Sequence, residues 1–442
     1  MDKTVLQMYK KYGLMVNSNR MFPLDIDGLK PVERRILLSA YQIARDKFVK
    51  CARVDGHCMG NFHPHSSSYG TLVQLYHQGF LDGQGNFGNK YSIEETPAAA
   101  SRYTECKLKK ETFNLAFKLI DYVPWVMCEV KDPAILEPAY LPTKYPISLI
   151  GKRFIDNIGF GYRTVIPSYS EKDLKSRLLY LLGITKTKPI IKPLTDCQVL
   201  TGNDDLEKLL TTGKGQVTFK GIYKVDASKS RVIIKSMPPG RKFESLLSKF
   251  DNELNNQDIG WIDESAAMNG GTHIVFEVIK SRNRDLIFKT FVKKLDDILK
   301  NTISFEMIVV DYETRNTKLI SVDKMLLNTY KMYKNVNMLM LKSEVNKFKK
   351  TKEEHSIIQK IRPFLGKELN TKENNIEIIS DNIAKKISLV SIDKNIVKDI
   401  IQKHRISKLL SASDDIKELD DKIKEINENI KNIDNFVLTQ YN

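Results

Sequence analysis

The stretch that decides the interpretation of this chain is Ala98-Ala99-Ala100-Ser101-Arg102-Tyr103-Thr104-Glu105, in which an arginine directly precedes a tyrosine. A tyrosine hydroxyl is a poor nucleophile at neutral pH, because its ordinary pKa is about 10. A neighbouring guanidinium stays charged and can hold a phosphate through two hydrogen bonds against the attacking oxygen. The pair therefore suits phosphoryl transfer from DNA to tyrosine, although a lone Arg-Tyr pair is more often a half-buried aromatic residue beside a surface arginine.

Three further motifs precede this stretch in a fixed order. Residues 20–35 read Arg-Met-Phe-Pro-Leu-Asp-Ile-Asp-Gly-Leu-Lys-Pro-Val-Glu-Arg-Arg. Residues 51–56 read Cys-Ala-Arg-Val-Asp-Gly, and Phe-His-Pro-His follows at 62–65. Residues 82–88 read Asp-Gly-Gln-Gly-Asn-Phe-Gly. Four ordered motifs are a far more specific signal than any one of them.

Together the four motifs resemble those of the gyrase A family, the DNA cleavage and religation subunits of type IIA topoisomerases. The resemblance implies an α+β multidomain fold with three parts: a winged-helix DNA cleavage domain (1–145), an α+β tower domain (146–322) and an antiparallel coiled coil with a helical dimerisation globule (323–442). The resemblance covers essentially the whole chain, but its motifs are tight only in the first third.

The carboxy-terminal segment has the repeat of a coiled coil, with apolar residues spaced by seven and then by three or four: Leu409, Ile416, Leu419, Ile423, Ile426, Ile430, Ile433 and Val437. We expect this seam to pair with an earlier antiparallel helix that carries Leu341, Val345 and Phe348. The arms are then about 323–355 and 406–442, around a globule at about 356–405 that the resemblance identifies as a dimer contact, the C-gate. The same seam could instead pair two chains.

Local patterns predict several elements before the coiled coil. Pro31 and Ser170-x-x-Asp173 are typical of helix starts. Helices are expected after Pro31, around 69–76 and 170, and at 242–254 and 286–299; strands are expected at 216–223, 231–235 and 272–278.

Composition indicates a polyanionic partner. The 442 residues carry 70 lysines and arginines against 54 acids, a net charge of +16, which favours DNA, RNA or an acidic protein through charge attraction. The resemblance selects double-stranded DNA. Five cysteines form no regular framework, and neither a signal peptide nor a membrane-length apolar run is present, so we expect a cytoplasmic protein with reduced thiols.

The resemblance assigns four catalytic residues. Tyr103 attacks a DNA phosphorus and keeps the 5′ end as a phosphotyrosine, so resealing needs no cofactor hydrolysis. Arg102 stabilises the phosphate, and His63 donates to the charge that develops on it. Arg20 positions the phosphate or assists deprotonation of the tyrosine; an arginine is a poor base, which favours positioning.

It also assigns five DNA-binding residues. Lys30, Arg34, Arg35 and His65 correspond to backbone contacts, with a solvated basic face as the plainer interpretation. Ile158, in the run Asn157-Ile158-Gly159-Phe160-Gly161, corresponds to an isoleucine that wedges between base pairs and bends the duplex, although an apolar residue between glycines is often core.

Cofactors and partners are expected to lie outside the chain. Cleavage needs Mg²⁺ and duplex passage needs ATP, but the sequence has neither an acidic metal-binding pair in a suitable context nor a P-loop. The resemblance implies that a gyrase B-like subunit binds both, that this chain is a homodimer, and that the two assemble into a heterotetramer. We expect no metal ligand in this chain. The short, Lys/Asn/Ile-rich chain suggests a phage-type subunit, and its end at Asn442 predicts relaxation and decatenation without supercoiling.

Two other functions fit parts of the sequence. A zinc-stabilised nucleic-acid binder would use the cluster Cys51, His57, Cys58, His63 and His65, but the adjacent His57-Cys58 makes tetrahedral closure difficult. A degenerate structural subunit is the other alternative, and the intact Arg102-Tyr103 pair argues against it.

Overall fold

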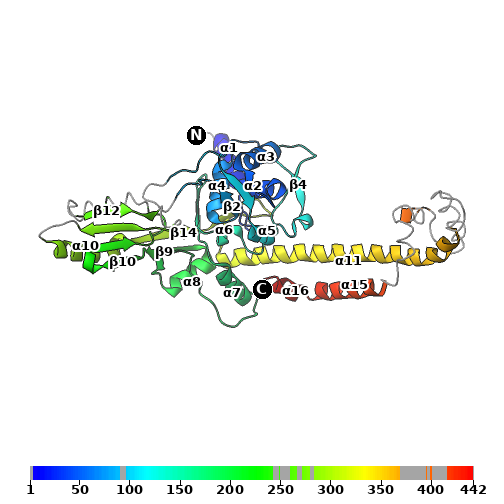
Figure 1. The fold of residues 1–442 in the computed structure, drawn as a ribbon. Coiled ribbons are helices and arrows are strands. Elements are labelled where there is room, and N and C mark those ends of the chain that lie inside the picture. The colour runs from blue at the N-terminus through cyan, green and yellow to red at the C-terminus, as the bar shows by residue number, and fades with distance from the viewer. Residues whose placement is uncertain are drawn as a thin grey trace. The chain divides into compact units, whose positions relative to one another are not determined.

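The computed structural model of the chain describes residues 3–89, 96–241, 248, 259–265, 271–278, 283–368, 395, 399–400 and 416–441. The chain divides into two compact units, Met1–Tyr333 and Lys334–Asn442. Figure 1 gives the element labels. The described secondary structure is a mixture of α-helices and β-strands, as expected. No helix among the described residues is long and apolar enough to cross a bilayer.

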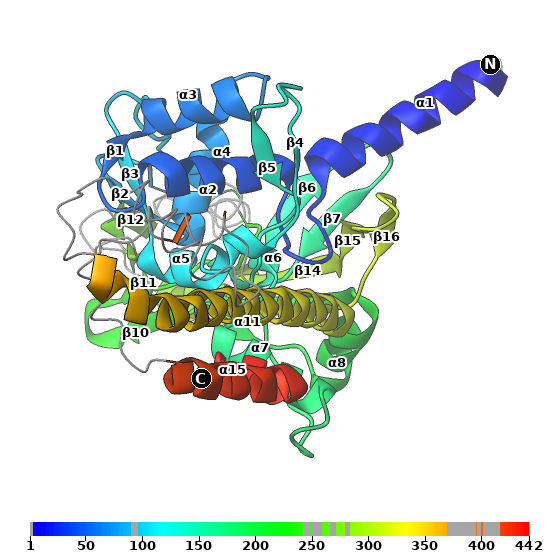
Figure 2. The same cartoon turned by 90° about the vertical axis from the view of Figure 1, so that its right-hand side faces the viewer.

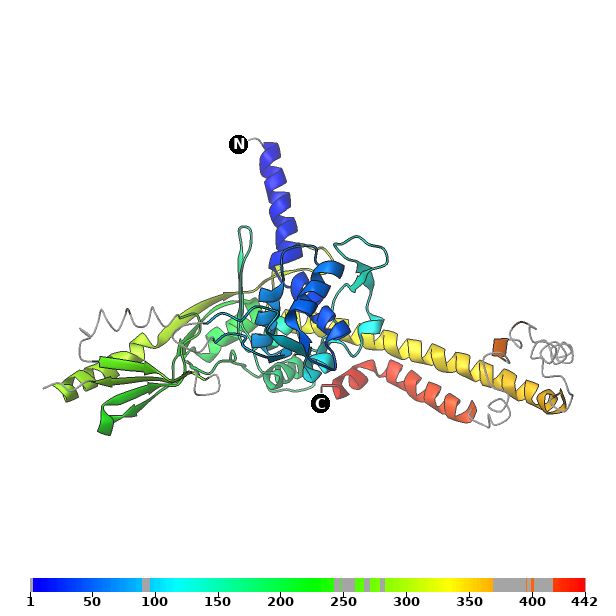
Figure 3. The same cartoon turned by 45° about the horizontal axis from the view of Figure 1, so that its top comes forward.

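Helices dominate the start of the first unit, and α1 extends away from the others (Figure 3). The elements are α1 Lys3–Val16, the π-helix η1 Asn17–Met21, α2 Pro31–Ile43, α3 Cys51–Asn61, α4 Tyr69–Gln78, α5 Lys110–Ala116 and the 3-10 helix η2 Ile120–Tyr122. A small antiparallel sheet of order β1-β3-β2 joins them: β1 Val49–Lys50, β2 Leu81–Gln84 and β3 Glu105–Leu108.

Helix α2 forms the centre of this helical region. It begins at Pro31, as predicted, because proline lacks only an N–H that the first turn would leave unpaired. The N–H of Lys30 donates to the Glu33 carboxylate at 2.8 Å, which fixes the helix start. Ile36 and Leu37 are fully buried. The next two helices are joined by Asp55 of α3, whose carboxylate accepts hydrogen bonds from residues 67 and 68 before α4.

Two antiparallel sheets follow. The first has the order β6-β7-β14-β9-β8 and the second β10-β11-β13-β12. Their strands are β6 Ile155–Ile158, β7 Arg163–Ile166, β8 Gln198–Val199, β9 Lys214–Lys220, β10 Tyr223–Asp226, β11 Arg231–Ile234, β12 Ile259–Asp263, β13 Ile274–Val278 and β14 Lys300–Glu306. The predicted strands at 231–235 and 272–278 are confirmed, whereas the region 216–223 is divided, because β9 ends at Lys220 and β10 begins at Tyr223.

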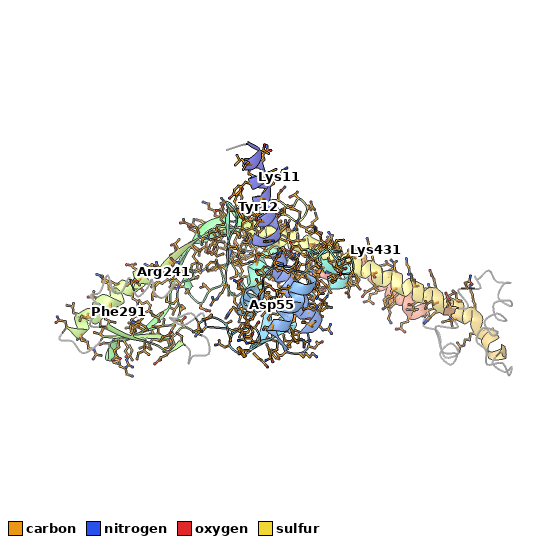
Figure 4. The ribbon with its side chains drawn as sticks, turned by 90° about the horizontal axis from the view of Figure 1, so that it is seen from above. Lys11, Tyr12, Asp55, Arg241, Phe291 and Lys431 are labelled. Atoms are coloured by element: carbon orange, nitrogen blue, oxygen red, sulfur yellow. The ribbon has the colours of Figure 1, made fainter. Side chains whose placement is uncertain are left out.

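The helix α10 Arg284–Ile298 covers the second sheet and confirms the helix predicted at 286–299. Its Phe291 packs against Phe276 of β13, with ring centroids 5.6 Å apart. Asp55 lies in the helical region, and Arg241 and Phe291 lie toward the two sheets (Figure 4). The helix predicted at 242–254 lies outside the described residues, apart from Ser248.

Short elements complete the first unit: the hairpins β4 Trp125–Met127 with β5 Leu136–Pro138 and β15 Ile308–Val310 with β16 Thr317–Leu319, the helices α6 Ile147–Ile150, α7 Glu171–Leu181 and α8 Asn203–Thr212, and the 3-10 helix η3 Ala227–Lys229. Ser170 caps α7 by accepting from the N–H of Asp173, as its sequence predicted. The fully buried Arg177 pairs with Glu207 and Asp323 and ties α7 and α8 to the first turn of the next helix.

That next helix is α11, Val322–Glu368, whose later part lies in the second unit with α15 Ile416–Lys431 and α16 Ile433–Thr439. Lys334 pairs with Asp434, whereas Lys352, further along α11, pairs with the earlier residue Asp420. The two partners therefore run in opposite directions, and the described arm pairing lies within one chain.

Apolar residues of the predicted seam are buried in this unit, among them Leu341, Val345, Leu419, Ile433 and Val437. Helix α11 continues to Glu368, past the expected end of the first arm at 355. Leu409 and most of the expected globule at 356–405 lie outside the described residues.

Candidate active site and nucleic-acid interface

Tyr103 lies in a turn two residues before β3, and its side chain is 63% exposed. Its N–H donates to the carbonyl of Ala100 at 2.8 Å, which closes the turn. The Arg102 guanidinium lies 4.6 Å from the centroid of the Tyr103 ring, and its side chain is also exposed. A hydroxyl and a fixed positive charge are thus presented side by side to solvent.

The backbone of the glycine-rich motif at 82–88 packs closely against the segment that contains this turn. Gly85 has a φ of +96°, and a Cβ there would lie 3.2 Å from the Tyr103 carbonyl oxygen. Gly88 has a φ of +82°, and a Cβ there would lie 2.3 Å from the Thr96 carbonyl oxygen, closer than any side chain permits. The glycines therefore let the two backbones approach each other.

The amino-terminal end of α3 holds the same turn through two backbone hydrogen bonds. The N–H of Cys51 donates to the carbonyl of Thr104 at 3.0 Å, and the N–H of Ala52 donates to the carbonyl of Ser101 at 3.1 Å. First-turn N–H groups have no partner within their own helix, so the turn satisfies them. The position of Tyr103 is therefore fixed by the start of α3.

A cluster of four predicted site residues lies past the other end of α3. The Arg35 Nη1 donates to His63 Nδ1 at 3.0 Å. The Arg20 Nη2 lies 3.4 and 3.3 Å from the two ring nitrogens of His65. The two imidazole rings are 4.6 Å apart and nearly perpendicular. We call Arg20, Arg35, His63 and His65 the donor cluster.

Two carboxylates from the β4–β5 hairpin complete the surroundings of the donor cluster. Glu137 accepts two hydrogen bonds from the Arg35 guanidinium, both at 2.7 Å. Glu129 accepts from the Arg35 Nη1 at 2.9 Å and lies 3.0 Å from the Nε2 of His65. Burial alone would lower the pKa of Arg35, but these carboxylates raise it above its usual value.

Sequence reasoning missed both carboxylates. They lie 94 and 102 residues after Arg35 and belong to none of the four motifs. Only the folding of the β4–β5 hairpin against the end of α3 brings them to the arginine.

The protonation of His63 follows from its neighbours. Burial is the largest cause that lowers its pKa, to about 4; the charges of Arg35, His65 and Arg20 act in the same direction, and Glu129 opposes them. His63 is therefore neutral at pH 7. Because a guanidinium can only donate, Nδ1 accepts from Arg35 and Nε2 carries the proton. The free donor of His63 is its Nε2–H.

His63, His65 and Glu129 are also the one group among the described residues with potential metal-ligand atoms close enough to share an ion, within 4.8 Å of one another. The Arg35 Nη1 already bonds to two of these three residues. A metal ion would meet a guanidinium in its place, so the residues do not fit Mg²⁺ or zinc. Cys51 lies at the opposite end of α3, which argues against the zinc-binding alternative.

The donor cluster and Tyr103 of one chain do not meet. Helix α3 has 11 residues and separates its two ends by about 16 Å at 1.5 Å per residue. Figure 2 shows one end of α3 beside β1 and the other toward β4. No hydrogen bond, ion pair or ring contact in the described part of the chain joins Tyr103 to the donor cluster.

Two of the predicted DNA contacts are buried. Arg34 is 6% exposed and pairs with both oxygens of Asp27 at 2.8 and 3.1 Å, while also donating to the Leu29 carbonyl. This argues against the predicted backbone contact, because reaching DNA would leave the Asp27 carboxylate buried without its partner. Arg35 is 4% exposed, and its guanidinium belongs to the donor cluster rather than to a solvated face.

Ile158 stands at the end of β6 with 75% of its side chain exposed, so it is not a core residue. The turn after it is held firmly. The Asn17 side chain donates to the Phe160 carbonyl at 2.9 Å and accepts from the Phe160 N–H at 2.8 Å. Asn17 is 1% exposed and begins η1, the short helix that also carries Arg20. An exposed apolar tip on a fixed hairpin suits insertion between base pairs.

A groove of about 820 Å³ lies beside this hairpin and is lined in part by Lys30 and Asn157. The Lys30 Nζ lies 3.5 Å from the Asn157 Oδ1 and 3.5 Å from Glu33. The lysines and arginines of the lining outnumber its acids: Lys30, Lys152, Arg153, Lys235 and Arg241 against Glu33, Asp156 and Asp196. Such an excess attracts a phosphate backbone.

Comparison with known proteins gives one family. The family model for the A subunits of DNA gyrase and topoisomerase IV matches residues 20–441. The A subunit of DNA gyrase from Kosmotoga olearia is 28% identical over 341 residues, which cover 72% of this chain and 41% of that protein. The corresponding gyrase protein of Thermotoga maritima is 29% identical over 342 residues (71% and 41%). The A subunit of DNA topoisomerase 4 from Neisseria gonorrhoeae is 28% identical over 353 residues (70% and 44%). The matches thus span less than half the length of these relatives.

Proposed function

Because the chain belongs to the family of DNA gyrase and topoisomerase IV A subunits, we propose that it breaks and rejoins duplex DNA as one component of an ATP-dependent type IIA topoisomerase. The observation that carries the proposal is the exposed Tyr103 beside Arg102, on a turn fixed by two glycines and the start of α3. In this assignment the helical region is the winged-helix cleavage domain, the two sheets form the tower, and the arms lead to the C-gate.

Tyr103 is the nucleophile. Its oxygen forms a bond to the DNA phosphorus as the bond from phosphorus to the 3′ oxygen breaks; the tyrosine loses a proton and the 3′ oxygen gains one. The phosphotyrosine ester keeps the bond energy, and the reverse attack by the 3′ hydroxyl reseals the strand. Arg102 holds the phosphate, and the donor cluster stabilises the charge that grows on it, with the Nε2–H of His63 as a neutral donor.

Two copies are needed to assemble one reaction site. Since α3 separates Tyr103 from the donor cluster in one chain, we propose that Tyr103 of one protomer works with the donor cluster of its partner. A two-fold axis across one duplex would form two such sites, one for each strand. The basic groove and Ile158 bind and bend the duplex between them.

Mg²⁺ and ATP belong to a gyrase B-like partner in this proposal, and the working assembly is a heterotetramer. The described residues of this chain do not fit the metal, because the Arg35 guanidinium fills the only cluster with suitable ligand atoms among them. The contribution of this chain is therefore the nucleophile, phosphate donors and the DNA-binding surface.

The direct test is replacement of Tyr103 by phenylalanine in the reconstituted assembly. With partner, Mg²⁺ and plasmid, a detergent quench of the wild-type assembly should release linear DNA bound to protein. Tyr103→Phe should yield none while its DNA affinity stays nearly unchanged, because binding comes from the groove. Tyr12→Phe, at a 52% exposed tyrosine on α1, is the matched control and should cleave normally. Adduct formation by Tyr103→Phe would refute the assignment.

A further inference from the structure

Glu129 occupies the place in the donor cluster where an anion fits best. One oxygen of its carboxylate, Oε2, lies 2.9 Å from the Arg35 Nη1 and 3.0 Å from the His65 Nε2, and so occupies two donors of the cluster. Guanidinium and imidazole N–H groups bind carboxylates and phosphates with similar geometry. A phosphate oxygen entering the cluster would have to take the same donors.

The charges around Glu129 support this description. Leaving the histidines aside, two guanidinium groups, of Arg20 and Arg35, face two carboxylates, of Glu129 and Glu137. With both carboxylates in place the cluster has no net charge to attract a phosphate. Partial burial alone would raise the pKa of Glu129, but Arg35 and the hydrogen bond with His65 lower it. The carboxylate is therefore ionised at pH 7.

We propose that Glu129 is a built-in stand-in for a DNA phosphate, which fills the donor cluster in the free protein and leaves when a DNA phosphate enters. The inference rests on the proposed function, since it takes the donor cluster as the phosphate site. Glu129 is then a positioning residue: it keeps Arg35 and His65 in place before DNA binds, and it lowers the affinity of the cluster for anions.

The two carboxylates differ in their freedom to move. The Glu129 side chain is 33% exposed, whereas that of Glu137 is 13% exposed and pairs with the far edge of the Arg35 guanidinium. The backbone next to Glu129 is anchored, because the Cys128 thiol donates to the Asn61 carbonyl at 3.2 Å. Departure of Glu129 therefore needs rotation of a side chain only, and Glu137 continues to orient Arg35.

This arrangement has a consequence for the substrate. A single phosphate that replaces Glu129 exchanges one anion for another and gains little. A duplex that is already held by the basic groove and bent at Ile158 presents its phosphate at high local concentration and can displace the carboxylate. The donor cluster would thus be engaged by a bound duplex and not by free phosphate.

The test is Glu129→Gln in the full chain with its partner, because this change keeps the shape and removes the charge. Fluorescence anisotropy with a labelled duplex is measured over a series of salt concentrations. We expect the variant to bind roughly threefold to tenfold more tightly, with a salt dependence steeper by about one phosphate contact. Asp132→Asn is the matched control: it makes the same charge change on the same hairpin but keeps the oxygen that accepts from the Ala134 N–H, so binding should not change.

A second variant separates this role from a purely structural one. The gain from Glu129→Gln should be smaller in a His65→Ala background, because one of the two released donors is then missing and only the Arg35 Nη1 remains. An affinity and salt slope equal to wild type, or an equal gain with and without His65, would overturn the proposal. If a thermal melt shows that Glu129→Gln is not folded, Glu129→Asp is used in its place. The shorter Asp carboxylate cannot reach both donors. Tighter DNA binding by this variant supports the role of Glu129 as a stand-in, and unchanged binding refutes it. Failure of the wild-type assembly to bind the duplex would refute the proposed function instead.

Discussion

At the residue scale, His63 shows how a motif residue acquires its chemical state. Its motif, Phe62-His63-Pro64-His65, identifies a histidine but not its protonation. The neutral form comes from burial and from Arg35, which occupies Nδ1 and leaves the Nε2–H for a ligand. A neutral donor does not depend on a proton that is lost as the pH rises through the usual range of histidine.

The lowered pKa of His63 predicts a pH dependence of stability. Unfolded His63 binds a proton near its ordinary pKa of about 6.5, whereas the folded form does so only near 4, so the unfolded state holds more protons between these values. Stability is therefore fully present above the unfolded value and is lost as the pH falls toward 4. Arg35, Arg20 and His65 disfavour the charged imidazole, and Glu129 favours it.

The measurement is denaturant unfolding of wild type and His63→Gln at pH 7 and pH 5. Glutamine retains hydrogen-bonding groups but does not titrate. Other groups also respond to acid, so the quantity of interest is the difference between the two proteins: wild type should lose more stability between pH 7 and pH 5. Equal losses would contradict the lowered pKa.

At the element scale, the β6–β7 hairpin and η1 act as one unit. Asn17 bonds both backbone groups of Phe160 at the hairpin tip, and Arg20 lies three residues further along η1. The exposed Ile158 and Arg20 of the donor cluster are thus positioned by the same buried side chain. Both the bending of the duplex and the placement of Arg20 should therefore depend on the Asn17 side chain.

We predict that Ile158→Ala and Asn17→Ala separate an effect on bending of the duplex from an effect on stability of the protein. Ile158→Ala should reduce bending of an end-labelled duplex, measured by energy transfer, without lowering the melting temperature, because the side chain is 75% exposed. Asn17→Ala should reduce bending and also destabilise the first unit by about 1–3 kcal/mol, since it leaves buried polar groups without partners. If neither variant reduces bending of the duplex, the hairpin is not part of the DNA interface.

The elements that the sequence predicts well are those with local signals. Pro31 begins α2, Ser170 caps α7, and the apolar runs of β9, β11 and β13 are strands, because propensity and period act over a few residues. The same local view could not show that the Arg34 side chain turns inward to Asp27. It also could not find Glu129 and Glu137, because their positions near Arg35 depend on a hairpin about a hundred residues away.

The roles of Tyr103, Arg102, His63 and Arg20 remain predictions from the family resemblance. The structure adds their placement, which no motif spacing reveals: His63 lies past one end of α3, and Tyr103 lies beside the other. The two residues are thereby separated by the length of a helix, and this separation determines how the whole molecule is expected to work.

At the scale of the whole molecule, we propose that each reaction site combines two protomers. The described pairing of the antiparallel arms, Lys334 with Asp434 and Lys352 with Asp420, forms within one chain. Each site would take Tyr103 and Arg102 from one protomer and the donor cluster from its partner. Inactivating changes placed on different protomers should therefore complement each other at one of the two sites.

The most direct test of this account is a mixed dimer, assembled with the gyrase B-like partner from a Tyr103→Phe protomer and a His63→Ala protomer carrying different affinity tags. If sites form between protomers, one site lacks both residues and the other has both, so the mixed dimer should nick plasmid and attach to one strand. The attached protein should be the His63→Ala protomer, which retains Tyr103. If each site forms within one chain, both sites lack a residue, and nicking should not exceed that of the His63→Ala homodimer. That result would contradict the account.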